Sequence, residues 1–214
     1  TQCTIVGVYD NGQLTPSATL IDKESGGYLR KILKRRDIEG KANQVQIVHD
    51  VPKVKATRII LIGLGDPETM DAARFAGVAR AATTSLKTLV AKNTLCCLTE
   101  IEVAGHDVSW RTERLIEAFR AGFYTFTDYK GNPPEKSSSV KSIELSAANR
   151  GEQAQINQSI QIGAALGAGV AIAKDLGNTP GNVCTPTYLA DKAKELAKRY
   201  DSITTTIVDE KKME

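Results

Sequence analysis

The sequence predicts an α/β fold, and three observations lead to this prediction. Short β-rich runs alternate with amphipathic helical runs along the 214 residues. The run at 58–62 is continuously apolar, as expected of a central strand that is covered on both faces. Hydrophobic residues make up 41% of the chain and charged residues 25%, so the chain can bury a sizeable core. These features indicate a globular protein in which helices cover a sheet.

The elements expected in the first half follow from short apolar runs and from helical spacing. A first strand is expected at 3–8, where β-branched residues dominate. A short basic helix is expected at 28–36, because its apolar residues recur at helical spacing. Strands follow at 44–49 and 58–62, and an Ala-rich segment of high helix propensity follows at 70–92.

The second half is expected to continue the same alternation. Glycine and proline at 177–182 end a long helix, and Thr185 with Pro186 can begin the next one. The expected elements are a strand at 94–98, a helix at 109–124, a proline-rich loop at 132–139, a strand at 140–145, helices at 151–176 and 186–200, and a strand at 203–208.

Cysteine usage and hydropathy indicate the cellular compartment in which the protein is expected. None of Cys3, Cys96, Cys97 and Cys184 stands in a Cys-x-x-Cys pair, which favours a reducing cytoplasm over a disulfide framework. Residues 1–10 show no signal-peptide pattern. The longest apolar stretch, about a dozen residues interrupted by glycines, is shorter than the ~20 that a membrane span needs. We therefore expect a cytoplasmic protein without a membrane partner.

Catalytic and metal-binding patterns are not visible in the residues alone. His49 and His106 have no partner at ligand spacing, and neither a His-Glu-x-x-His nor a Gly-x-Ser-x-Gly motif occurs. The segment 63–65, Gly-Leu-Gly after an apolar strand, raises the hypothesis of a dinucleotide site. Glu68 stands where the third glycine would be, which favours a plain strand-to-helix turn.

For two glycines and one cysteine, a role in packing is favoured over a functional role. Gly163 and Gly167 are spaced so that another element can pack closely against the long helix, and tight core packing is the favoured meaning. Cys184 has no partnered base nearby in the sequence and is expected to be an ordinary buried thiol.

Basic residues gather in two clusters. Clusters of this kind neutralise phosphates in nucleic-acid-binding proteins, but they also form the solvated side of amphipathic helices, which is the favoured interpretation here. The first cluster consists of Arg30, Lys31, Lys34, Arg35 and Arg36, and the second of Lys192, Lys194, Lys198 and Arg199.

One segment resembles a known family. Residues 175–190, Asp-Leu-Gly-Asn-Thr-Pro-Gly-Asn-Val-Cys-Thr-Pro-Thr-Tyr-Leu-Ala, resemble the segment that joins the two domains of leucyl aminopeptidases. In that family a long helix ends in Asn-x-Pro-x-Asn, and Thr-Pro begins the first helix of the catalytic domain. Segments at 5–8, 58–65 and 121–130 resemble other parts of the family in the same order, so the resemblance spans essentially the whole chain.

The resemblance implies a domain organisation. Residues 1–148 would form a three-layer, mixed-sheet N-terminal domain similar to macro domains. Residues 149–182 would form the interdomain linker helix and turn, and residues 183–214 the truncated beginning of a second α/β domain that carries the catalytic site.

The resemblance also implies an activity. Leucyl aminopeptidases are cytoplasmic hexamers that remove N-terminal residues from peptides with two divalent metals, zinc or manganese. The family places its ligands in Lys-Gly-x-Thr-x-Asp and Asn-Thr-Asp-Ala-Glu-Gly-Arg motifs, and neither occurs here. We therefore assign no catalytic or metal-binding residue to this chain. We expect it to be inactive alone, to hold no metal, and to serve assembly and access to the active site.

Two alternatives follow from the same resemblance. Some bacterial relatives bind DNA, and the cluster of Arg30, Lys31, Lys34, Arg35 and Arg36 is the local support for DNA binding here. Because the N-terminal domain resembles macro domains, a nucleotide-binding module is the third hypothesis, with the turn at Gly63 as its candidate site.

Overall fold

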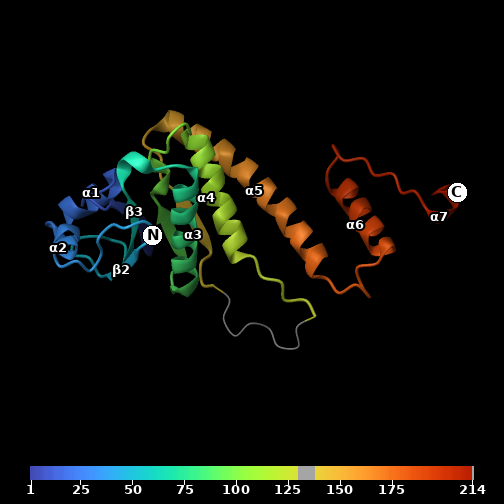
Figure 1. Cartoon of the computed structure of the whole chain (residues 1–214), viewed down its shortest axis with the longest axis horizontal. Helices are drawn as coiled ribbons and strands as arrows, with labels where there is room; N and C mark the ends of the chain where they lie inside the picture. Colours follow the sequence, from blue (N-terminus) through green and yellow to red (C-terminus); the bar gives the residue numbers. More distant parts are fainter. Residues whose placement is uncertain (130–137, 214) are drawn as a thin grey trace. The chain divides into compact units, whose positions relative to one another are not determined.

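The structure is a computed structural model that describes residues 1–129 and 138–213 (Figure 1). Most of the loop expected at 132–139 lies outside the described residues, as does Lys130 of the segment 121–130. The strands are β1 (Cys3–Tyr9), β2 (Val45–His49), β3 (Arg58–Gly65), β4 (Asn93–Cys96) and β5 (Ser142–Leu145). The α-helices are α1 (Pro16–Glu24), α2 (Tyr28–Lys34), α3 (Ala72–Thr88), α4 (Val108–Phe123), α5 (Arg150–Asn178), α6 (Pro186–Arg199) and α7 (Glu210–Met213), and the 3₁₀ turns are η1 (Pro67–Thr69) and η2 (Leu98–Glu100).

Within the described residues the strands form one mixed sheet in the order β2-β3-β1-β4-β5. β1 pairs in parallel with both β3 and β4, and β4 pairs in parallel with β5, whereas β2 is antiparallel to β3. The carboxyl ends of β1, β3, β4 and β5 therefore meet at one edge of the sheet. In open α/β sheets this edge is where ligands commonly bind.

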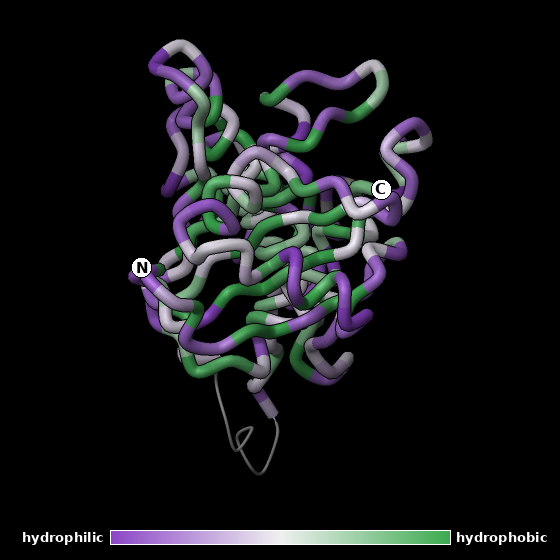
Figure 2. The backbone as a smooth tube through the Cα atoms, turned by 90° about the vertical axis from the view of Figure 1, so that its left-hand side faces the viewer, coloured by the Kyte–Doolittle hydropathy of each residue, from purple (hydrophilic) through white to green (hydrophobic). Residues whose placement is uncertain are grey.

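Helices cover both faces of the sheet. On one face, residues of α3 and α4 such as Phe75 and Leu115 pack against Ile60 and Ile62 of β3. On the other face, α1 and α2 pack against the alternate side chains of the same strands. Figure 2 shows hydrophobic and hydrophilic stretches alternating along the backbone. This α/β/α layering confirms the predicted fold class, and β3 is covered on both faces as expected.

α1 is the helix that the sequence analysis missed. Its N-cap Thr15 has extended backbone angles, and Pro16 occupies the first helical turn. The hydroxyl of Thr15 also accepts a hydrogen bond from Gly7 N at 3.3 Å, which ties the helix start to β1. This Thr-Pro start is the signal that correctly predicted α6 at Thr185, so it could have revealed α1 as well.

α5 packs against α4 through its glycines, as predicted. A Cβ built at Gly163 would lie 2.9 Å from Ile116 Cβ, and one at Gly167 would lie 2.7 Å from Arg120 Cγ. Among the described residues, α5 alone is long and apolar enough to cross a membrane by length and composition, with 22% of its most apolar window buried. The close approach of Gly163 and Gly167 to α4 shows that one face of this helix packs within unit 1.

Two expectations about local structure were wrong. Residues 203–208 form no strand, because within the described residues no neighbouring strand is available to pair with their backbone. Gly63 and Gly65 do not turn the chain after a strand but belong to the end of β3 itself, where Gly63 pairs with Val8 of β1 and, after a register shift, Gly65 pairs with Tyr9.

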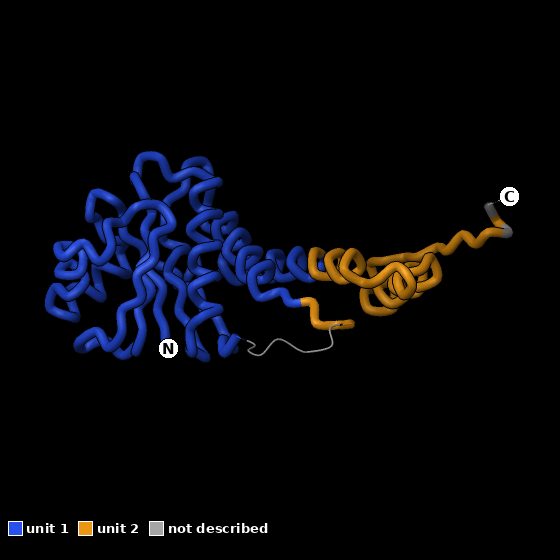
Figure 3. The backbone as a smooth tube through the Cα atoms, turned by 60° about the horizontal axis from the view of Figure 1, so that its bottom comes forward, with its two compact units in different colours: residues 1–125, 134–169 blue, residues 126–133, 170–214 orange. Residues whose placement is uncertain are grey.

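The chain divides into two compact units (Figure 3). Unit 1 comprises residues 1–125 and 134–169 and contains the sheet with α1 to α4. Unit 2 comprises residues 126–133 and 170–214 and contains α6 and α7. Within unit 2, the Thr205 hydroxyl donates a hydrogen bond to Ala193 O at 3.0 Å, which holds the extended segment 203–208 against α6.

Candidate functional site

A hollow of about 470 Å³ opens at the carboxyl edge of the parallel strands in unit 1. Elements from distant parts of the sequence meet there: the first turn of α1, η2, the start of α4 and the segment between β5 and α5. Its lining residues are Pro16, Ser17, Leu20, Thr99, Glu100, Glu102, Arg111, Ser146, Ala147, Ala148 and Glu152.

The carboxylate of Glu100 occupies the N-terminus of α1. It accepts hydrogen bonds from Ser17 N at 3.1 Å and from Ser17 Oγ at 2.7 Å. Backbone N–H groups in the first helical turn are the groups that bind phosphates in nucleotide-binding folds. In this protein an internal carboxylate takes that position, so a phosphate has no access to it.

The same hollow holds two further intramolecular hydrogen bonds. The hydroxyl of Thr99 donates to Ser146 O at 2.7 Å and thereby ties η2 to the end of β5. Glu152 accepts a hydrogen bond from Ala148 N, and its own N–H donates to Asn149 Oδ1 at 3.0 Å. The side chain of Asn149 thus caps the start of α5, and Glu152 reaches back to the residue before the cap.

Carboxylates outnumber cations around this hollow. Glu100, Glu102 and Glu152 line it together with one arginine, Arg111, whose Nη1 donates to Ile101 O at 2.7 Å. Burial raises the pKa of the nearby Tyr9 hydroxyl, and the charges of Glu102 and Glu100 raise it further. The negative potential disfavours phosphate-bearing ligands at this edge.

The space beside residues 63–65, the candidate dinucleotide site in the sequence, is filled by the chain itself. A Cβ at Gly63 would lie 2.0 Å from the carbonyl oxygen of Lys41, and Gly65 faces Ala42 with a φ of +76°. Gly63 N donates to Gln44 O and Gly65 N donates to Gly40 O. The glycines let segment 40–44 pack on β3, so the nucleotide hypothesis at Gly63 is wrong.

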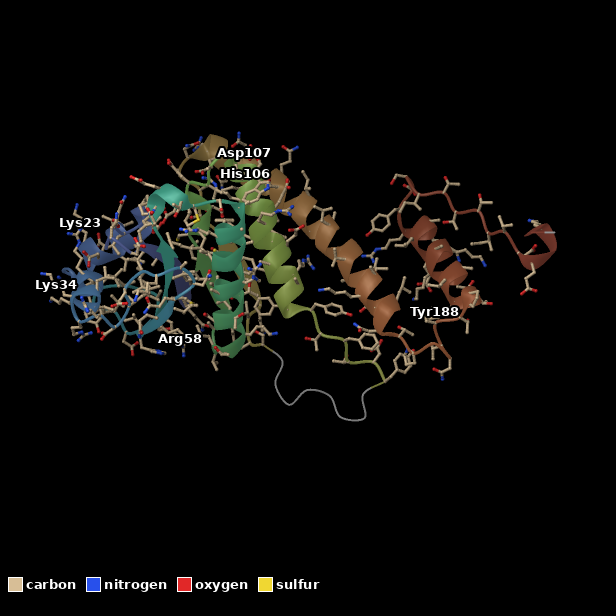
Figure 4. The ribbon with its side chains drawn as sticks, viewed as in Figure 1. Lys23, Lys34, Arg58, His106, Asp107 and Tyr188 are labelled. Atoms are coloured by element: carbon tan, nitrogen blue, oxygen red, sulfur yellow. The ribbon has the colours of Figure 1, made fainter. Side chains whose placement is uncertain are left out.

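The first basic cluster lies in α2 and the residues that follow it. Arg30, Lys31, Lys34, Arg35 and Arg36 are all exposed, while Leu29 and Ile32 of the same helix are buried. Arg30 Nε pairs with Asp22 Oδ2 at 3.1 Å, and Arg35 Nη2 pairs with Asp37 Oδ2 at 3.0 Å. Figure 4 shows Lys34 at the same end of unit 1 as Lys23 of α1. The cluster is therefore the solvated side of an amphipathic helix. Two of its exposed guanidinium groups form ion pairs with carboxylates of the same chain.

The second basic cluster lies in α6 of unit 2. Lys192 Nζ pairs with Glu195 Oε2 at 2.8 Å, and Lys194 Nζ pairs with Asp191 Oδ1 at 3.1 Å. The hydrogen bond from Lys192 to Glu195 raises the pKa of Lys192. These pairs favour the solvated-face interpretation for this cluster also.

His106 and the buried cysteines have structural surroundings, whereas His49 at the end of β2 is exposed. His106 stacks on Trp110, with ring centroids 3.8 Å apart, near the start of α4 (Figure 4). Cys96 and Cys97 belong to the cores on opposite faces of the sheet, because successive side chains at the end of a strand point to opposite faces. Burial raises the pKa of both thiols, so neither is a nucleophile near neutral pH. Cys184 is only partly buried.

Similarity to known proteins establishes the family. The N-terminal domain of the cytosol aminopeptidase family matches residues 5–133. The chain belongs to this family. A probable cytosol aminopeptidase from Actinobacillus pleuropneumoniae serotype 5b is 36% identical over the whole chain, and one from Vibrio parahaemolyticus is 35% identical over 99% of it. The predicted family is thereby confirmed.

The chain spans 43% of the Actinobacillus aminopeptidase and 42% of the Vibrio aminopeptidase. Solved structures share the fold at lower identity. A leucine aminopeptidase mutant from tomato has a TM-score of 0.75 at 21% identity, covering 99% of this chain and 42% of that one. The bottromycin maturation enzyme BotP in complex with Mn has a TM-score of 0.67 at 18% identity, covering 92% and 36%.

The aminopeptidase family implies divalent metals, but the donor groups found here do not fit them. Within residues 1–129 and 138–213, no three His, Cys, Asp or Glu side chains gather as metal ligands. At the carboxyl-edge hollow, Glu100 and Glu152 are hydrogen-bonded to backbone N–H groups. No catalytic step is therefore assigned to residues of this chain. Glu100 and Arg111 are not among the candidates from the sequence, because no local pattern indicates that both line this hollow.

Proposed function

We propose that this chain is the N-terminal portion of a two-metal leucyl aminopeptidase that removes N-terminal amino acids from peptides. The carrying observation is the match of residues 5–133 to the N-terminal domain of the family. The complex of a structurally similar enzyme with Mn supports a divalent metal, manganese or zinc, in the full-length parent. A cytoplasmic location fits the name of the family.

The chain itself is proposed to be non-catalytic and to serve assembly and access to the active site. Its sequence contains neither Lys-Gly-x-Thr-x-Asp nor Asn-Thr-Asp-Ala-Glu-Gly-Arg, the motifs in which the family places its metal ligands. Residues 1–148 are proposed as the N-terminal domain, 149–182 as the linker, and 183–214 as the beginning of the catalytic domain. The parent is proposed to form a hexamer without a membrane partner.

Hydrolysis of leucine-anilide tests this assignment. The chain and its full-length parent are assayed with added manganese or zinc, and free leucine is measured. Release of leucine by the parent alone is the expected result. Metal-dependent release by the chain would contradict its non-catalytic role, and inactivity of both would contradict the aminopeptidase assignment.

DNA binding is the second candidate function, carried by one observation. Arg30, Lys31, Lys34, Arg35 and Arg36 all remain exposed on one short stretch of unit 1. Contacts of such side chains with backbone phosphates give affinity that falls steeply with salt concentration. A gel shift of duplex DNA with the chain, repeated over a salt series, tests it.

Charge reversal separates this candidate from non-specific attraction. Arg35→Glu together with Arg36→Glu is expected to abolish the shift. Lys55→Glu together with Lys87→Glu changes the net charge equally at exposed sites outside the cluster and is expected to preserve it. Equal loss in both double variants, or no shift of the unaltered chain, would contradict DNA binding at this cluster.

A further inference from the structure

A second hollow in unit 1 has the opposite charge to that at the carboxyl edge. It has a volume of about 460 Å³ and lies between the turn that follows β1 and the outer sides of α1 and α2. Its lining residues are Asn11, Gly12, Gln13, Leu14, Thr19, Arg30, Leu33 and Lys34. These eight described residues include two cations and no carboxylate. A pocket of this size accommodates a small ligand.

The two cations differ in how firmly they are placed. Arg30 Nε is paired with Asp22 Oδ2, and Arg30 N donates to Asp22 Oδ1 at 3.0 Å. Asp22 is buried, with 6% of its surface exposed, so its ion pair orients the Arg30 guanidinium. Because this pair uses Nε, the terminal N–H groups of Arg30 remain as donors for a ligand. Lys34 is exposed and forms no salt bridge within the described part of the chain, so its ammonium is available for a ligand.

Neutral donors and an apolar wall complete the hollow. Asn11 Oδ1 accepts a hydrogen bond from Gln13 N at 2.9 Å, which fixes the turn and leaves the Asn11 amide N–H groups as donors. Leu14 is 8% exposed, and Leu33 is half-buried beside the cations. Phosphate groups with a less polar body attached match this mixture of donors and apolar surface.

The net charge of the chain segment that carries both cations favours the same ligand class. Residues 22–41 hold seven basic and four acidic residues, a net charge of +3, which equals the formal net charge of the whole chain. At the carboxyl-edge hollow, by contrast, Glu100, Glu102 and Glu152 face one arginine. A phosphate-bearing ligand in unit 1 is therefore drawn to the hollow at Lys34 and repelled from the edge of the sheet.

We propose that the hollow at Lys34 binds the phosphate groups of a nucleotide-sized ligand. Lys34 and Arg30 would hold the phosphates, and Leu33 would contact the sugar or base. The inference deepens the proposed DNA binding, with which it shares these two residues, by naming where a phosphate docks. The shared chemistry has two sources: a free nucleotide and the terminal or backbone phosphate of a nucleic acid.

Isothermal titration of the whole chain with ATP, tripolyphosphate and adenosine tests the proposal. ATP and tripolyphosphate are expected to bind and adenosine is not, because the phosphates supply the charged contacts. Lys34→Glu and the milder Lys34→Gln are expected to raise the Kd for ATP, Lys34→Glu by about tenfold or more. Lys87→Glu, at an exposed lysine outside residues 22–41 that does not line the hollow, is expected to leave the Kd for ATP unchanged. Equal affinity in the Lys34 variants and the unaltered chain, or no binding of ATP, would overturn the proposal.

A gel shift of duplex DNA with the Lys34→Glu variant separates this proposal from the proposed DNA binding. Loss of a shift in Lys34→Glu, together with loss of ATP binding, supports a backbone phosphate in the hollow. ATP binding that needs Lys34 while duplex DNA fails to bind supports the free nucleotide and rejects the proposed DNA binding. A shift that needs Arg35 and Arg36 but is unaffected in Lys34→Glu supports DNA binding and overturns the docking of a phosphate in this hollow.

Discussion

Glu100 and Ser17 are 83 residues apart in the sequence, yet the Glu100 carboxylate accepts hydrogen bonds from both the backbone N–H and the hydroxyl of Ser17. This contact joins η2, which follows β4, to the first turn of α1. The negative charge lies at the positive end of the helix dipole, which makes the interaction favourable. The contact therefore stabilises the carboxyl edge of the sheet. It also occupies the N-terminus of α1, the position at which a phosphate could otherwise bind.

Replacement of Glu100 by alanine is expected to destabilise unit 1. The variant leaves the N–H of Ser17 without its charged acceptor, at a cost of about 1 kcal/mol for a partly exposed group. Urea unfolding followed by circular dichroism measures the change. Glu102→Ala is the matched control, because Glu102 lines the same hollow but is exposed. Equal destabilisation by both variants would contradict a specific role of the Glu100–Ser17 contact.

Gly163 and Gly169 lie on the same helix and are expected to respond to alanine with opposite signs. Alanine at either site gains about 1 kcal/mol of helix propensity. At Gly163 the new Cβ would lie 2.9 Å from Ile116 Cβ and 3.4 Å from Glu113 Cα, so α5 must move away from α4. At Gly169 it would meet no described atom within 4 Å. Thermal unfolding is expected to show a lower Tm for Gly163→Ala and a higher Tm for Gly169→Ala. A higher Tm for both would contradict tight packing at Gly163.

The sequence predicts most elements of the sheet layers because their signals are local. β3 is recognisable from its continuous apolar run, and the glycine face of α5 from its spacing. The strand expected at 203–208 failed because β propensity alone provides no pairing partner. α1 was missed because its few apolar residues, Ala18 and Ile21 among them, make a weak helical stripe.

The two hollows are harder to predict, because they depend on long-range contacts. Lys34 belongs to a basic cluster that is visible in the sequence, but its position beside Asn11 and Gln13 follows only from the packing of α2 near the end of β1. Glu100 has no local signal at all, since its partners lie in α1 and its neighbours in the hollow come from α4 and α5. Residue types can suggest a charge, but topology decides which charges meet.

Thiol labelling is expected to distinguish Cys184 from the other cysteines. Cys3, Cys96 and Cys97 are at most 2% exposed, and burial raises the pKa of each thiol, so little reactive thiolate is present or accessible at neutral pH. Cys184 is partly exposed in unit 2. Mass spectrometry after brief treatment with iodoacetamide is expected to find one rapid modification, at Cys184, and four in urea. Cys184→Ser is the control, and rapid labelling of this variant in the folded state would contradict the burial of the remaining thiols.

Cys3 is expected to make the stability of unit 1 fall at alkaline pH. Burial raises the pKa of its thiol from 9.0 to about 11, while the charge of Arg58 partly opposes this shift. The unfolded chain thus loses the Cys3 proton first, and stability that is complete below pH 9.0 is lost as the pH rises towards about 11. Two pKa units correspond to about 2–3 kcal/mol. Urea unfolding under reducing conditions over this range is expected to show a smaller loss in Cys3→Ala than in Cys184→Ala, which keeps the buried thiol. The same loss in both variants would show that Cys3 does not contribute to the alkaline instability.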